Sequence, residues 1–553
     1  MNLMKKRIIL VAALALMSQS CEKILEEEIV SGITAGIYYK TPQGWKGGVN
    51  AVYETLRYWY GREEGFTFTT FGTDTYTKGA DGSYKYFNDY DGQLNAASGY
   101  FSSTWREFYQ GINTANTVID RADAVEGLSE TDKVTGIAEA RALRALYYFI
   151  LVQTYGPIHL TLEETTAPTT EANRTPVDRI YSEAIVPDLD FAIANLPATT
   201  SQLGRVTKPV AQALRARVAA VMGDWTKVEE MANAVINEGG FSLLPRFIDL
   251  WDISNDKNQE IIWSVQYTAD PLTNAANGNA GGNRGHLYFL SEYDQIAGMK
   301  RDIANGRPWK RFQPTMYLLT LFERGVDSRY EGSFKDVFYV NNAATAPAGL
   351  NVGDTAYYVV PYAVPDEIQK SKPYFFVDVD PNATDEVMKL RQINYRWFPT
   401  LRKHLDPLRL TIQQEEGRRD FPVIRLAEMY LLLGESLMMQ GRHEEAAEAI
   451  NVVRRRAAFP GQETAIEIDA SVLSGTGDHE GIDFILDERA RELVGEMHRW
   501  FDLKRTGKLI ERVQKYNPDA AQNIQNFHLY RPIPQDQLDR VSGGYQQNEG
   551  YGG

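Results

Sequence analysis

The chain has 553 residues, of which 43% are hydrophobic and 24% charged, and its formal net charge is -15. A surface this acidic repels a phosphate backbone, so we expect no nucleic-acid partner. The apolar content is enough to bury a sizeable core. Because the chain contains a single cysteine, internal disulfide bonds are excluded and packing must hold the fold.

The first twenty residues have the pattern of a bacterial export signal. Three cations, Lys5 to Arg7, precede an apolar run from Ile8 to Met17, about half the ~20 residues that a membrane-spanning helix needs. Cys21 follows at once. Cleavage before Cys21 removes three positive charges and brings the formal charge to -18. The alternative is an ordinary signal peptide followed by an incidental buried cysteine.

The position of Cys21 resembles the lipobox of bacterial lipoproteins, in which the cysteine is acylated, although Ser18 replaces the usual leucine. The acidic run from Glu22 to Glu28 resembles the tag that sends such lipoproteins to the cell surface in Bacteroides-type bacteria. These resemblances imply a chain that is lipid-anchored in the outer membrane and faces outside.

Aromatic residues are concentrated between Tyr58 and Tyr109, where they make up sixteen of fifty-two positions, against 11% in the whole chain. Many alternate with Asp, Asn and Gly, a mixture that suits a sugar, because its C–H faces stack on rings and its hydroxyls bond to carboxylates and amides. Trp105, Phe108 and Tyr109, at helical spacing, are expected to be core, together with about half of the remaining rings. The candidate ligand residues in this region are Asp74, Tyr76, Tyr84, Tyr86, Asn88 and Tyr90.

Helical periodicity is strongest at 136–154, 176–195, 207–237 and 423–457. The last two segments carry small and apolar residues at the offsets of a tetratricopeptide repeat, with Gly223-Asp224-Trp225 as the turn of the earlier hairpin. Residues 60–110 and 265–405 have the composition of long irregular insertions, with short β-like runs at Glu260 to Tyr267 and Ala356 to Tyr362. In the second insertion the candidates are Arg284, Tyr288, Trp309, Arg311 and Trp397.

A series of motifs in a fixed order resembles the SusD/RagB family of outer-membrane nutrient-binding lipoproteins. The motifs are Arg141 to Phe149 with Thr154 to Ile158, Thr207-Lys208-Pro209, Arg425 to Tyr430, Asp487 to Leu493, His498 to Leu503, and the closing Asn548-Glu549-Gly550-Tyr551. Glu549 stands where the family has proline. We interpret the motif residues as structural, because Arg141, Arg144 and Tyr148 share one helix face and Glu488 to Glu492 can bridge helices.

The resemblance implies a mostly α fold, in which a tetratricopeptide-like helical scaffold carries long loops and few short strands, as one domain over residues 21–553. It also implies a non-catalytic, cofactor-free protein that binds a glycan through loops near Asp74 to Asn95 and Arg284 to Arg311. The helical side would pack on a SusC-like TonB-dependent transporter in the outer membrane.

Three other functions stay open. A glycoside hydrolase needs only two carboxylates, and the chain has 73 acidic residues. A peptide could replace the glycan, as in some relatives, and the hairpins could serve as a protein-binding scaffold. Scattered histidines, and a calcium-like run at Asp378-x-Asp380-x-Asn382 that lacks the turn glycine and the closing Glu, predict no metal site.

Overall fold

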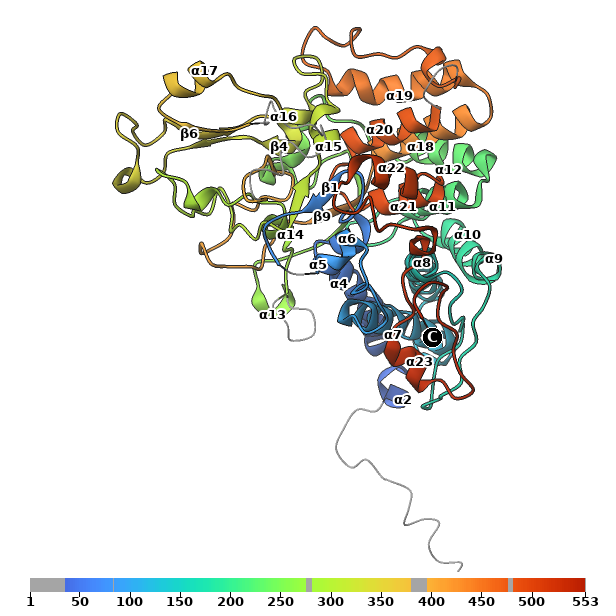
Figure 1. The fold of residues 1–553 in the computed structure, drawn as a ribbon. Helices are drawn as coiled ribbons and strands as arrows, with labels where there is room; N and C mark the ends of the chain where they lie inside the picture. The colour runs from blue at the N-terminus through green and yellow to red at the C-terminus, as the bar shows by residue number, and fades with distance from the viewer. Residues whose placement is uncertain (1–34, 83, 275–280, 379–394, 476–480, 553) are drawn as a thin grey trace, which may run out of the picture.

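The computed structural model describes residues 35–82, 84–274, 281–378, 395–475 and 481–552. Helices form one side of the molecule, and the insertion that carries most of the short strands forms the other (Figure 1). Among the described residues, every helix is too short or too polar to cross a bilayer. The leader, Cys21, the acidic run and the residues from Asp380 onward in the calcium-like segment lie outside the described residues.

The principal helices of the scaffold are α3 (Pro42–Val52), α7 (Gly99–Arg121), α8 (Glu130–Tyr155), α9 (Val177–Ile180), α10 (Val186–Asn195), α11 (Lys208–Met222), α12 (Trp225–Glu238), α18 (Leu426–Met439), α19 (His443–Ala457), α20 (Gly481–Glu492), α21 (Arg499–Arg505) and α22 (Leu509–Tyr516). Shorter helices include α2 (Ala35–Tyr38), α4 (Leu56–Trp59), α5 (Glu63–Thr69), α6 (Tyr86–Asp89), α13 (Pro271–Asn274), α14 (Gly285–Tyr288), α15 (Met316–Thr320), α16 (Arg329–Ser333), α17 (Asp366–Ser371) and α23 (Gln535–Arg540).

Two helical hairpins, α11–α12 and α18–α19, pack on each other through α12 and α18. The first turns at Gly223, which adopts φ 73°, and Asp224 caps α12 by accepting from the Lys227 N–H. In the second, Gly434 lets the helices touch, because a Cβ there would lie 2.6 Å from Ile450. The predicted helical segments are confirmed except at 423–425, which form the end of a strand.

The strands form small, separate sheets rather than one layer. β1 (Tyr76–Lys78) pairs with β3 (Phe312–Pro314), β2 (Ile261–Val265) with β9 (Phe421–Arg425), and β4 (Phe334–Lys335) with β8 (Thr400–Leu401), all antiparallel. The only described sheet with three strands has the order β5 (Val337–Tyr339), β6 (Thr355–Val359), β7 (Phe375–Val377). Of the two runs predicted to be β-like, the first contains β2, and the second overlaps β6, which begins one residue earlier, at Thr355.

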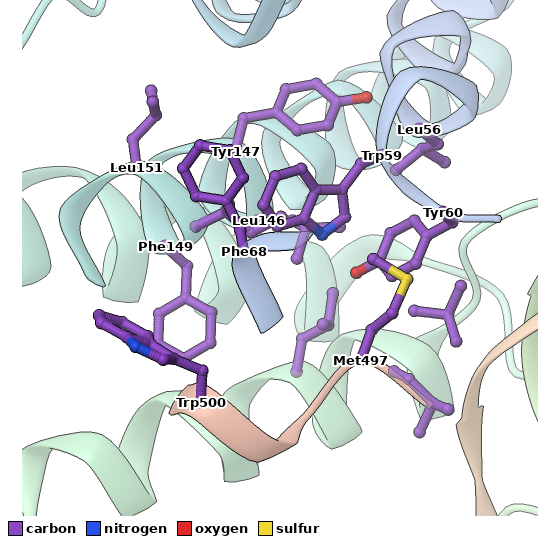
Figure 2. Close-up of a cluster of buried hydrophobic side chains, with 14 of the residues drawn as sticks. Leu56, Trp59, Tyr60, Phe68, Leu146, Tyr147, Phe149, Leu151, Met497 and Trp500 are labelled. Atoms are coloured by element: carbon purple, nitrogen blue, oxygen red, sulfur yellow. The ribbon is translucent and has the colours of Figure 1, made fainter. Parts of the chain in front are cut away.

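One part of the main core lies where α4 and α5 meet α8 and the start of α21. Figure 2 shows Trp59 and Phe68 beside Tyr147 of α8, with Met497 and Trp500 closing the cluster from the opposite side. The Trp59 and Phe68 ring centroids are 5.6 Å apart. Twelve of the sixteen rings between Tyr58 and Tyr109 are buried, more than predicted, whereas Tyr109, predicted to be core, is only partly buried. The aromatic-rich first insertion is therefore anchored in the helical scaffold by most of its own rings.

A buried ion network joins the second insertion to the late hairpin. Arg425 contacts Glu260 at 3.0 Å, Glu492 at 2.6 Å and Glu496 at 2.7 Å. Arg329 reaches Glu488 at 2.7 Å. The network, as we use the term, comprises five cations and five carboxylates: Arg329, Lys403, Arg425, Arg454, Arg456, Glu260, Asp327, Glu488, Glu492 and Glu496.

The cations of the network keep Glu492 ionised. Burial alone would raise the pKa of Glu492, but Arg456 and Arg425 outweigh burial and lower it to about 2. Removing one partner from such a group leaves a buried charge uncompensated, which typically costs more than the pair itself contributes.

We predict that Arg425→Met destabilises the protein by about 3–5 kcal/mol, because three buried glutamates, Glu260, Glu492 and Glu496, each lose one of their cationic partners. The matched control is Arg455→Met on the exposed side of α19, where Arg455 pairs with Glu448 and Glu467 at the surface. Its cost should stay below about 1 kcal/mol. Denaturant unfolding measures both, and equal losses would contradict the role given to the network.

Candidate functional site

The two aromatic-rich loops meet along one seam. β1 and β3 pair Thr77 with Gln313, and the ladder is extended by Gly79 N–H donating to Arg311 O at 2.9 Å. Asp81 N–H then donates to Lys310 O at 3.2 Å. Two segments more than two hundred residues apart therefore lie side by side, near α5, α6 and α14 in the middle of the view in Figure 1.

Trp309 is the centre of this surface. Its half-buried ring lies 4.9 Å from the Arg311 guanidinium carbon and 5.7 Å from the Tyr288 ring centroid. Arg311 in turn pairs with Glu63 of α5 and, at 3.4 Å, with Asp81. The carboxylates fix the guanidinium, which fixes the indole by a cation–π contact.

A second ring pair lies at the start of α7. Tyr84 stacks on Tyr100 with centroids 3.9 Å apart and ring planes within 19°. Burial, with Glu64 and Tyr84 nearby, raises the pKa of Tyr100 far above its ordinary value, so its phenol is neutral. Tyr86 stands edge-on to Tyr84 and shares a 2.7 Å hydrogen bond with Ser98. We call Glu63, Glu64, Asp81, Tyr84, Tyr100, Tyr288, Trp309 and Arg311 the ring face.

Two further candidates border the ring face. Trp397 donates its indole N–H to Glu292 O at 3.2 Å, and the Glu292 carboxylate binds Lys310 at 2.7 Å and Arg396 at 2.6 Å. Arg284, at the start of the helix that carries Tyr288, pairs with Glu415 at 3.1 Å. Both residues therefore belong to ion-paired walls beside the rings.

Part of the backbone at this surface is strained. Tyr84, Lys310 and Tyr395 have φ of 55°, 53° and 57°, in the left-handed region that non-glycine residues rarely adopt. They are three of the five such residues in the described part of the chain. Each costs of order 1–3 kcal/mol, and such strain tends to cluster where a site needs a defined side-chain placement.

Comparisons with known proteins place the chain in a family. A model described as "SusD family" matches residues 259–551, and one described as "Starch-binding associating with outer membrane" matches residues 48–219. The chain belongs to the SusD family. It is 26% identical to SusD-like protein P25 of Formosa agariphila, over 94% of each chain, and 25% identical to starch-binding protein SusD of Bacteroides thetaiotaomicron, over 78% of this chain and 75% of that one.

A solved structure of a laminarin-binding SusD-like protein superposes with a TM-score of 0.69 at 25% identity, covering 93% of this chain and all of that one. A SusD homologue from Bacteroides thetaiotaomicron gives 0.70 at 21% identity, covering 92% and 97%. The family resemblance read from the motifs and the mostly α, tetratricopeptide-like fold are confirmed.

The motif residues of this SusD family member are structural, as their spacing indicated. Arg144 binds Asp188 with two bonds of 2.8 Å, and Arg489 binds Asp502 at 2.8 Å. At the end of the chain, Asn548 donates to Tyr155 O and Arg531 O, both at 2.8 Å, and so fastens the tail to the last turn of α8. Glu549 in place of proline leaves these bonds intact.

Four candidate ligand residues need correction, because the structure places them inside the protein with protein neighbours. Asp74 is fully buried and binds Arg499 and, at 2.9 Å, Arg512; burial would raise its pKa, but the two guanidiniums outweigh burial and lower it. Tyr76 packs against Phe289 at 5.1 Å. Asn88 accepts from Asn517 at 3.0 Å, and Tyr90 donates to Gly72 O at 2.9 Å.

The remaining candidates divide by exposure. Tyr84, Tyr86, Trp309, Trp397 and Arg284 are partly exposed. Tyr288 and Arg311 need the same correction as the four above, because they are buried beneath Trp309 and support its ring rather than contact a ligand. Sequence reasoning missed Glu63, Glu64, Asp81 and Tyr100. Asp81 lies within the predicted loop, and the pair Glu63-Glu64 directly follows the first ring cluster, but nothing in the sequence shows that Glu63 meets Arg311. Burial raises the pKa of Glu64 above its ordinary value.

The ring face offers stacking surfaces, fixed charges and hydroxyls but no strong metal ligand set. Among the described residues, no group of three or more His, Cys, Asp or Glu side chains is arranged to hold a metal ion. What the arrangement can do chemically is hold a ligand that has apolar faces and many hydroxyls.

We predict that Tyr76→Phe leaves ligand binding unchanged and stability unchanged or about 1 kcal/mol higher. The buried Tyr76 hydroxyl has no hydrogen-bond partner among the described residues. Burying it therefore costs desolvation free energy that no hydrogen bond offsets, and Phe avoids this cost. Thermal unfolding and ligand titration check this. A loss of binding with an intact fold would show instead that Tyr76 contributes to the ligand site.

Proposed function

We propose that the chain is a cell-surface lipoprotein that binds an oligosaccharide or polysaccharide at the ring face and delivers it to a SusC-like TonB-dependent outer-membrane transporter, without catalysis. The observation that carries the proposal is that β1 and β3 join the loop that carries Trp309 to the loop that carries Tyr84, which stacks on Tyr100. The backbone is strained at Tyr84 and Lys310, and ion pairs hold Arg311 beneath Trp309. The names of the starch-binding and laminarin-binding relatives support a glycan as the ligand.

Binding is expected to be reversible and modest. Stacked rings and hydrogen bonds that compete with water each contribute little net free energy, so micromolar or weaker affinity corresponds to roughly 8 kcal/mol or less. Weak binding suits a protein that delivers its ligand, since a ligand bound too tightly would not be released to the transporter. A peptide ligand is the alternative within the same family.

The non-catalytic part of the proposal rests on how the carboxylates of the ring face are engaged. Glu63 and Asp81 both pair with Arg311, so Glu64, whose pKa is raised by burial, has no second carboxylate of the ring face outside the Arg311 ion pairs to act with it. A glycosidase instead needs one carboxyl as a proton donor and a second one free to attack or to activate water. Incubation of the purified protein with starch or laminarin should produce no new reducing ends, and their appearance would favour the hydrolase alternative.

We predict that Trp309→Ala weakens retention of laminarin or starch oligosaccharides about tenfold or more, equivalent to about 1.4 kcal/mol. The melting temperature should change little, because Trp309 is only half-buried. The matched control is Trp225→Ala, which removes a half-buried indole from α12 on the helical side. Calorimetric titration and thermal unfolding measure both variants.

Two results would contradict this prediction. Unchanged retention in Trp309→Ala would remove Trp309 from the ligand site. A large drop in melting temperature would show that the indole is a core ring.

Lipid attachment at Cys21 can be tested separately. Labelled palmitate should be incorporated into the wild-type chain, and Cys21→Ser should abolish labelling and release the protein from the membrane fraction. Recovery of the mature wild-type chain in the cytosol, or an unlabelled wild-type chain, would overturn the lipoprotein proposal.

A further inference from the structure

A groove of about 970 Å³ lies beside α7, separate from the ring face. Its walls are α7, the segment of residues 165–172 and α23. Helix α23 packs against α7, and both lie below α4, α5 and α6 in the view of Figure 1. None of the sequence-predicted candidates lines this groove.

One face of α7 connects the groove with the ring face. Tyr100, at the start of α7, stacks on Tyr84 of the ring face, and Glu107, seven residues later on the same face, lines the groove. Between them, Ser103 and Thr104 both contact the Tyr58 hydroxyl, at 2.9 and 3.3 Å. From Tyr100 to Thr114, which also lines the groove, α7 rises roughly 21 Å.

The lining of the groove has the chemistry of a hydroxyl-rich ligand site. Trp105 and Tyr109 place their ring centroids 5.0 Å apart at 39°, and Tyr109 donates to His159 O at 2.6 Å. Around these rings the groove is lined by ten hydroxyl or amide side chains and by small apolar residues such as Ala167, Pro168 and Val541; the ten are Thr55, Ser102, Gln110, Asn113, Thr114, Thr165, Thr166, Thr169, Thr170 and Gln537. A peptide-binding groove would be expected to offer apolar pockets or a free strand edge instead.

The charges of the groove favour a neutral ligand. Its lining carries four carboxylates, Glu54, Glu107, Glu171 and Asp536, against two guanidiniums, Arg106 and Arg540. A sulfated or uronic-acid polymer would meet net like charge, whereas an uncharged glycan meets hydrogen-bonding partners only.

We propose that this groove is a second subsite for an uncharged polysaccharide, reached from the ring face along the Tyr100–Thr114 side of α7, so that long chains bind better than short ones. The inference rests on the proposed glycan-binding function and extends it. Short oligosaccharides would occupy the ring face alone.

The test fills the groove from its exposed rim. Thr166→Trp and, as a second variant, Ala167→Trp add bulk at exposed positions of the groove lining. Thr199→Trp is the matched control, at an exposed position outside the groove lining. Each variant and the wild type are titrated with laminaritriose and laminarin, and with maltotriose and soluble starch, after thermal unfolding has confirmed that the fold is intact.

We expect the wild type to bind one of the two polymers at least tenfold more tightly per chain than the matching trisaccharide. Thr166→Trp and Ala167→Trp should abolish this gain without changing trisaccharide binding, and Thr199→Trp should keep it. Trp309→Ala should weaken both ligands, which separates failure of the ring face from failure of the groove.

Three outcomes overturn the inference. The first is a wild type that shows no gain with chain length. The second is a gain that survives both groove variants. The third is a groove variant that binds polymer normally but no longer associates with its transporter, which would make the groove a protein-docking surface.

Discussion

Arg425 lies wholly inside the protein, yet its guanidinium meets carboxylates from three points of the chain: Glu260 before β2, and Glu492 and Glu496 after the late hairpin. Taking such charges out of water costs several kcal/mol per ion, so the arrangement is tolerable only when every partner is present. Arg329 and Lys403 extend the same network into the second insertion. We infer that the network fixes the position of this insertion relative to the helices.

The ring face depends on that fixed geometry. Arg329 and Lys403 anchor the insertion that carries Trp309, and Asp74 ties the first loop to α21 and α22 through Arg499 and Arg512. Between these anchors, the β1–β3 pair brings the two loops into contact. The scaffold therefore fixes the positions of the two loops. The rings themselves lie on these loops, whose sequence could change without disturbing the buried ion network.

The sequence predicted the helices well because their apolar residues repeat at the helical period over long stretches, as in α8 and in α11–α12. It predicted the ligand loops as regions but failed at several residues. Asp74 and Tyr90 share their composition with exposed sugar-binding motifs, and only long-range partners, such as Arg499 for Asp74, show that they are interior. Sequence analysis missed Glu63 for the same reason, because its partner Arg311 lies far away in the chain. Irregular loops have no period, so nothing local separates a buried ring from an exposed one.

The most direct test of the central claim is a crystal structure of the soluble chain, starting after Cys21, with a laminarin or starch oligosaccharide. The account predicts sugar rings stacked on Trp309 and against Tyr84, with hydroxyls within hydrogen-bond distance of the side chains of the ring face. Sugar bound only on the helical hairpins, with the ring face empty, would contradict it.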